Sequence, residues 1–145
     1  MSKTNACENS LLLLIFNNTD FALIGDAAGL QNSATAGSLY VSLHTADPGE
    51  AGDQSTSEIA YTSYARVAVA RSGAGWTVTG NSVSPAATIS FPAGTGGSGT
   101  ATHFGVGTSS SGAGVLLYKG AISPTIVCGN GITPQLTTAT AITED

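Results

Sequence analysis

Alternating apolar and polar residues mark the clearest structural element in the first half of the chain. In SLYVSLH (38–44), Leu39, Val41 and Leu43 fall on one face, and Tyr, Ser and His fall on the other. A period of two is typical of a half-buried β-strand. We therefore expect a strand over 38–44.

A second alternating segment is the centre of the predicted sheet. TATHFGVG (100–107) alternates with period two, and VLLY (115–118) is a short apolar run. The Ser- and Gly-rich segment 109–114 lies between them, and glycine adopts the positive φ angles that turns need. The three segments predict a β-hairpin against which the other strands lie.

Short runs of β-branched and apolar residues recur about every 8–12 residues, with Gly, Pro or Asn between them. Pro85 is expected to interrupt one run, and Pro124 to break the chain before another, because proline cannot donate to a strand ladder. This spacing predicts an all-β fold, an antiparallel β-sandwich or jelly-roll-like barrel. The remaining expected strands cover residues 59–70, 76–79, 83–91, 125–128 and 132–142.

The N-terminal segment has a different pattern. Residues 1–9 are polar and predict a flexible arm. Ser10 can cap a short helix over 11–16, which Asn17 would end. This helix is apolar on every side, so it either belongs to the core or docks onto another subunit. For a chain of 145 residues we expect one β-sandwich domain over 10–145 after the arm.

The composition points to association with other protein. Only 9% of residues are charged, against about 25% in ordinary soluble domains. Solubility normally depends on charge, so a surface this poor in charge favours packing against neighbours, and we predict a homo-oligomer. Four basic residues in a chain of net charge −5 argue against direct nucleic-acid binding. The longest apolar run has six residues, too few to cross a membrane.

Few residues suggest a metal or cofactor. Cys7 and Cys128 belong to no Cys/His cluster, so zinc is not expected; free thiols are favoured over a disulfide bridge. The glycine pattern of residues 94–99 formally matches a dinucleotide fingerprint, but it leads into a strand rather than a helix. We predict no cofactor and no metal.

The segment 45–57 is the longest predicted loop and is expected to project from the sheet. Asp47, Glu50 and Asp53 are spaced by threes in it. Such carboxylates could bind calcium, although the spacing does not match an EF-hand, and a solvated acidic loop is the simpler interpretation. Partner contacts are assigned to these three carboxylates together with residues of the apolar helix: Leu11, Leu14 and Phe16.

Two other functions need specific arrangements. A hydrolase would need His44 or His103 beside a serine and a carboxylate, and no G-x-S-x-G motif is present. We therefore predict that the chain is not an enzyme. A glycan-binding module would need an exposed aromatic cleft, for which the candidates are Tyr61, Tyr64 and Trp76.

Four phrases in order resemble a group of small structural proteins of tailed bacteriophages and prophages. They are SLYVSLHTADPGEAG, YTSYARVAVAR, GWTVTGNSVSPAATISFPAGTGGSGTATHFGVG and LLYKGAI. Members of the group are labelled tail-fibre proteins, and some resemble capsid cement or decoration proteins of jelly-roll type that are often trimers. The resemblance implies no catalytic or ligand-binding residue.

The resemblance implies a virion component made in the host cytoplasm. The first hypothesis is a cement protein on the capsid exterior, a favoured trimer that bridges and stabilises subunits of the major capsid protein. The alternative is a tail or tail-fibre module that binds a host-surface glycan.

Overall fold

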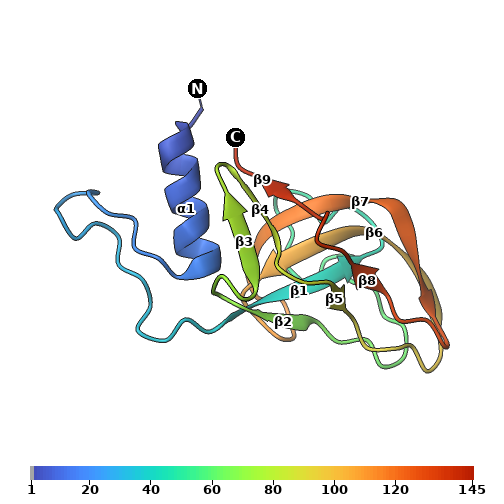
Figure 1. The fold of residues 1–145 in the computed structure, drawn as a ribbon. Helices are drawn as coiled ribbons and strands as arrows, with labels where there is room; N and C mark the ends of the chain where they lie inside the picture. Colours follow the sequence, from blue (N-terminus) through green and yellow to red (C-terminus); the bar gives the residue numbers. More distant parts are fainter. Residues whose placement is uncertain (1) are drawn as a thin grey trace. The chain divides into compact units, whose positions relative to one another are not determined.

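The computed structural model describes residues 2–145, which form two compact units (Figure 1). Unit 1 combines the chain up to Ser38 with Val69–Thr88 and Thr137–Asp145, and unit 2 combines Leu39–Ala68 with Ile89–Leu136. The structure is mostly β, with antiparallel sheets and one short N-terminal helix, which confirms the predicted fold class. The sheets do not close into a barrel.

Unit 1 is built around the helix α1 (Asn5–Asn17). The hydroxyl of Thr4 accepts a hydrogen bond from the N–H of Cys7, and Asn18 ends the helix in the left-handed conformation. The helix therefore begins at Asn5 and not at Leu11. Residues 5–9 are helical where a flexible arm was predicted, because Thr4 caps the helix six residues before the expected cap, Ser10. Met1 lies outside the described residues.

A small sheet accompanies α1 in unit 1. It has the order β3–β4–β9, with β3 at Trp76–Thr79, β4 at Ser82–Pro85 and β9 at Ile142–Thr143. The rings of Phe16 and Trp76 meet edge to face, with centroids 4.8 Å apart. Both side chains are buried, so the contact between α1 and β3 forms the core of unit 1.

Unit 2 contains almost all of the largest sheet, whose strand order is β2–β1–β6–β7. β1 (Ser38–His44) has the predicted bounds, whereas β2 (Val67–Ala70) covers only the end of the strand predicted over 59–70. The predicted hairpin is present as β6 (Ser98–Gly107) and β7 (Leu116–Gly129). Its tip, the segment 108–115, is termed the 108–115 turn below.

Pro124 does not break β7, which corrects the prediction. Ala101 of β6 faces Ile126, but His103 faces Ala121, so the pairing shifts by several residues at this point. Pro124 lies in this irregular stretch of an edge strand, where a missing N–H interrupts no regular ladder. By contrast, the interruption predicted at Pro85 is present, because β4 ends there.

Two more short strands complete unit 2. β5 (Ile89–Ser90) pairs with β8 (Gln135–Leu136).

Cys7 and Cys128 are both free, as predicted. The single domain predicted over 10–145 stays a prediction, which one cooperative unfolding transition would support. Within residues 2–145, no helix has the length and apolar character that crossing a bilayer requires.

Candidate functional site

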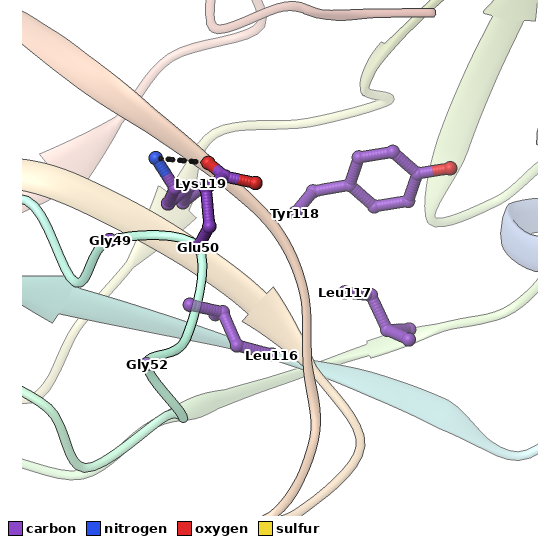
Figure 2. A pocket seen from close by; sticks show the side chains of 7 residues that line it. All are labelled: Gly49, Glu50, Gly52, Leu116, Leu117, Tyr118 and Lys119. Atoms are coloured by element: carbon purple, nitrogen blue, oxygen red, sulfur yellow. Dashed lines mark ion pairs between the residues drawn. The ribbon is translucent and has the colours of Figure 1, made fainter.

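A hollow of about 190 Å³ lies between the loop 45–57 and the start of β7 (Figure 2). Gly49, Glu50 and Gly52 line the loop side, and the residues of 116–119 line the strand side. Figure 2 shows the side chains of Leu116 and Lys119 on the loop side of β7, whereas those of Leu117 and Tyr118 point away from the loop. The hollow therefore combines an apolar side chain with the ionic groups of Lys119 and Glu50.

Lys119 brings together two of the carboxylates singled out in the sequence. Its Nζ lies 3.0 Å from Asp47 Oδ1 and 3.1 Å from Glu50 Oε1. The hydrogen bond to Asp47, and then that to Glu50, raises the pKa of Lys119. The pKa of Asp47 is lowered first by the N–H of Gly49 and then by Lys119. These ion pairs link the loop to β7 at the surface, and because Glu50 is 95% exposed they contribute little to stability.

Asp53 does not join this group. Its Oδ1 accepts hydrogen bonds from the N–H groups of Ser55 (2.8 Å) and Thr56 (3.1 Å) and from the Ser55 hydroxyl. The Ser55 hydroxyl is the main reason that the pKa of Asp53 is lowered. Asp53 therefore shapes its own turn. Among residues 2–145, no three His, Cys, Asp or Glu side chains are grouped so that they could hold a metal ion.

Gln54 ties the same loop to the 108–115 turn. Its side chain is completely buried; Oε1 accepts the N–H of Ser109 at 2.9 Å, and the backbone N–H of Gln54 donates to the carbonyl of Ala113. A Cβ at Gly107 would lie 2.2 Å from Gln54 Cδ, so only glycine fits there. The loop 45–57 was predicted to project from the sheet, but Gln54 anchors it by filling a site inside the fold.

Arg66 and Glu58 form a bidentate pair that the sequence did not reveal. Arg66 Nε and Nη2 each lie 2.7 Å from a carboxylate oxygen of Glu58. The guanidinium also donates to the carbonyls of Ser109 and Gly112, and the Tyr64 hydroxyl donates to Glu58. The hydrogen bond to Glu58 raises the pKa of Arg66. This pair fixes the 108–115 turn from its other side.

His44 is buried in a neutral form. Its Nδ1 lies 2.8 Å from the carbonyl oxygen of Thr56, which can only accept, so Nδ1 carries the proton. Nε2 then accepts the Ser42 hydroxyl at 2.8 Å. Within residues 2–145, the hydrogen-bond partners of the His44 ring are Ser42 and Thr56 and include no carboxylate, and His103 Nδ1 lies 2.9 Å from the Thr102 hydroxyl. The absence of enzymatic activity stays a prediction.

His44 should make unit 2 sensitive to mild acid. Burial lowers the pKa of His44 below its ordinary value of 6.5. Below about pH 6.5 the unfolded state then binds more protons than the folded state, so the free energy of unfolding should fall as the pH falls. Urea unfolding at pH 7.5, 6.5 and 5.5 measures this. His44→Gln should flatten the dependence in this window, and an unchanged slope would contradict the assignment.

The other predicted contact residues lie on α1. Leu11 and Leu14 are half-buried, and Phe16 is fully buried against Trp76. The burial of Phe16 favours the core interpretation at that position. The structure brings Asp47 and Glu50 together but not Asp53, and contact of any of the six residues with a partner stays a prediction.

The aromatic cleft expected for a glycan-binding module is not formed by its three candidates. Tyr61 and Trp76 are each 2% exposed, and Tyr64 is half-buried. The Tyr61 hydroxyl donates to the carbonyl of Pro92, and burial raises the pKa of Tyr61 to about 12. Tyr61 and Trp76 serve the core, and their burial counts against a stacking platform at these residues, while glycan binding by the chain stays a prediction.

A comparison with protein families identifies the context of the chain. The family model described as podophage GP4 fiber I protein gp80 matches residues 2–140. The chain belongs to this family. A comparison with curated proteins found no match.

Membership of the gp80 family makes the chain a phage virion structural protein. This confirms the coarser part of the resemblance seen in the sequence and the virion location that it implied. The family description names a fibre, whereas the first hypothesis from the sequence named a capsid cement protein.

Proposed function

We propose that the chain is a structural subunit of a podophage fibre that joins other virion proteins by protein–protein docking. The observation that carries this proposal is the match of the fibre family over residues 2–140. Since the match spans both compact units, it concerns the whole chain and not one motif.

The geometry of unit 2 supports a docking role. Gln54 and Arg66 fix the 108–115 turn from two sides, and the buried side chain of Gln54 also anchors the loop 45–57. A surface whose loops are already ordered loses less conformational entropy when it binds. Exposed apolar side chains on β7 and at the end of the 108–115 turn suit contact with protein: Leu117, Val127 and Val115.

The capsid-cement role is the second proposal, with the major capsid protein as partner and a homotrimer as the assembly. The same exposed side chains of β7 favour permanent contact with protein, whether on the head or on the fibre. In both proposals the chain has no catalytic activity and contacts neither nucleic acid nor membrane.

The place of the protein in the particle distinguishes the two. We expect cryo-electron microscopy of virions carrying a C-terminally tagged chain to place the tag on the tail or its fibres. Quantitative mass spectrometry should then give a low copy number relative to the major capsid protein. Density spread over the head lattice, with hundreds of copies per particle, would support the cement proposal instead.

A further inference from the structure

The chain after α1 forms an ordered projection, residues 21–30, here called the finger. In Figure 1 this blue segment runs out from α1 and returns. Phe21 and Leu30 exchange two backbone hydrogen bonds of 2.9 Å. Near the tip, Asp26 Oδ1 accepts the N–H groups of Ala28 and Gly29 at 2.8 and 3.0 Å. Its backbone is thus closed on itself.

The base of the finger is fixed as well. The side chain of Asn18 makes two hydrogen bonds with the backbone of Ser33, at 2.8 and 2.9 Å. Asp20 Oδ1 accepts the N–H of Asn32 at 2.7 Å. Arg71 donates to the carbonyl of Ala36 and to the last turns of α1. The finger is therefore held to α1 by side chains and not only by the chain connection.

One glycine shows that the sequence specifies this shape. Gly29 has a φ of +70°, and a Cβ on it would lie 2.1 Å from the carbonyl oxygen of Phe21. Any other residue would force the two sides of the finger apart.

The tip of the finger presents apolar side chains to solvent. Leu23 is 79% exposed, and Ile24 and Leu30 are 43% and 46% exposed. Leu23 also has a φ of 69°, a left-handed conformation that a leucine adopts with strain. Both the exposure and the strain are unfavourable in the isolated chain. An ordered element that keeps a strained leucine in solvent is typical of a contact that a partner completes.

Charge indicates what kind of partner. The finger and its base contain Asp20 and Asp26, and no Lys or Arg occurs between residues 4 and 65. Each of the four basic side chains of the protein is already engaged within its own chain: Lys3 with Glu144, Arg66 with Glu58, Arg71 with backbone carbonyls, and Lys119 with Asp47 and Glu50. A second copy therefore offers the finger no spare cation, and a different protein fits better.

We propose that the finger inserts Leu23 and Ile24 into an apolar recess, rimmed by basic side chains, on a different protein of the virion. The inference rests on the proposed function, because it names the contact by which the subunit is attached. Burial of Leu23 in the recess supplies affinity, and the two aspartates orient the finger against the basic rim.

Leu23→Asn tests this contact. Asparagine tolerates the left-handed conformation and removes the apolar surface, so the isolated chain should be as stable as the wild type or melt a few °C higher. Incorporation into virions, measured as copies per particle after complementation of a deletion phage, should fall about tenfold or more. If Leu23 had a merely structural role, attachment would fall only together with stability. A loss of attachment at unchanged stability therefore supports the contact.

Ser63→Asn is the matched control. Ser63 is exposed and has a φ of 78°, so this variant changes another left-handed position, outside the finger and outside the loop 45–57 and the 108–115 turn. It should be incorporated at the wild-type level. If Leu23→Asn is incorporated equally well, the inference fails while the proposed function stands; if the wild-type chain is itself absent from particles, the proposed function fails.

A photo-crosslinking residue at Ile24 identifies the recess in intact virions. We expect a crosslink to a different virion protein, at a peptide that contains apolar residues and Lys or Arg. A crosslink to a second copy of this chain, or to an acidic peptide, would overturn the proposal.

Discussion

Arg66→Ala is expected to lower the free energy of unfolding of unit 2 by about 3–5 kcal/mol. The Arg66 side chain is 2% exposed, and that of Glu58 is 18% exposed. Removing the guanidinium deprives Glu58 of both short ionic hydrogen bonds and leaves it with the Tyr64 hydroxyl. Two carbonyls of the 108–115 turn lose their donor as well. Urea unfolding at pH 7.5, followed by circular dichroism, measures the loss.

Two variants show whether geometry or charge matters at this site. Arg66→Lys keeps the charge but cannot form the bidentate pair, so its loss should lie between those of wild type and Arg66→Ala. Lys119→Ala removes a more exposed ammonium and should change the stability much less. If Arg66→Ala proves no more destabilising than Lys119→Ala, the pair with Glu58 contributes far less than its burial indicates.

The strands were the most predictable part of the fold. Period-two alternation identified β1 with its observed bounds because the pattern is local, although Ser42 and His44 on the polar face are buried as well. The hairpin of β6 and β7 followed from the same signal and from the glycines of its turn. Pro124 was misjudged, because the effect of a proline depends on whether its strand lies at an edge, and that is a property of the sheet order.

The candidate site was less predictable, since its bonds join distant segments. Asp47 and Glu50 were recognised as a cluster, but Lys119, which draws them together, lies about seventy residues further on. Gln54 bonds to backbone groups of the 108–115 turn and of β1, and Arg66 adds two backbone carbonyls of that turn to its pair with Glu58. A polar side chain that bonds to a backbone group has no partner of complementary residue type. The sequence therefore shows no pair of residues from which the contact could be predicted. The exposed leucine of the finger was equally hidden, because Phe21–Ile24 resembles any short apolar run.

Trp76→Ala should destabilise unit 1 by about 3–5 kcal/mol, the usual effect of deleting a large buried aromatic side chain. Trp76 is 2% exposed and packs edge to face on Phe16, so alanine would leave a cavity between β3 and α1. Trp76 is the one tryptophan of the chain, and the variant therefore has to be followed by circular dichroism. A loss below about 1 kcal/mol would show that the core of unit 1 can collapse around the gap.

Trp76→Phe separates the packing of the ring from its polar atom. The indole Nε1 of Trp76 is buried and has no hydrogen-bond partner, and an unpaired buried donor costs about 1–3 kcal/mol. Phenylalanine removes this donor and keeps a ring that can meet Phe16, while it leaves a smaller volume unfilled. Because the two effects oppose each other, we expect a net change in the free energy of unfolding of less than about 1.5 kcal/mol. If Trp76→Phe were as destabilising as Trp76→Ala, the contribution of Trp76 to the stability of unit 1 would come from the volume of the indole and not from its ring contact with α1.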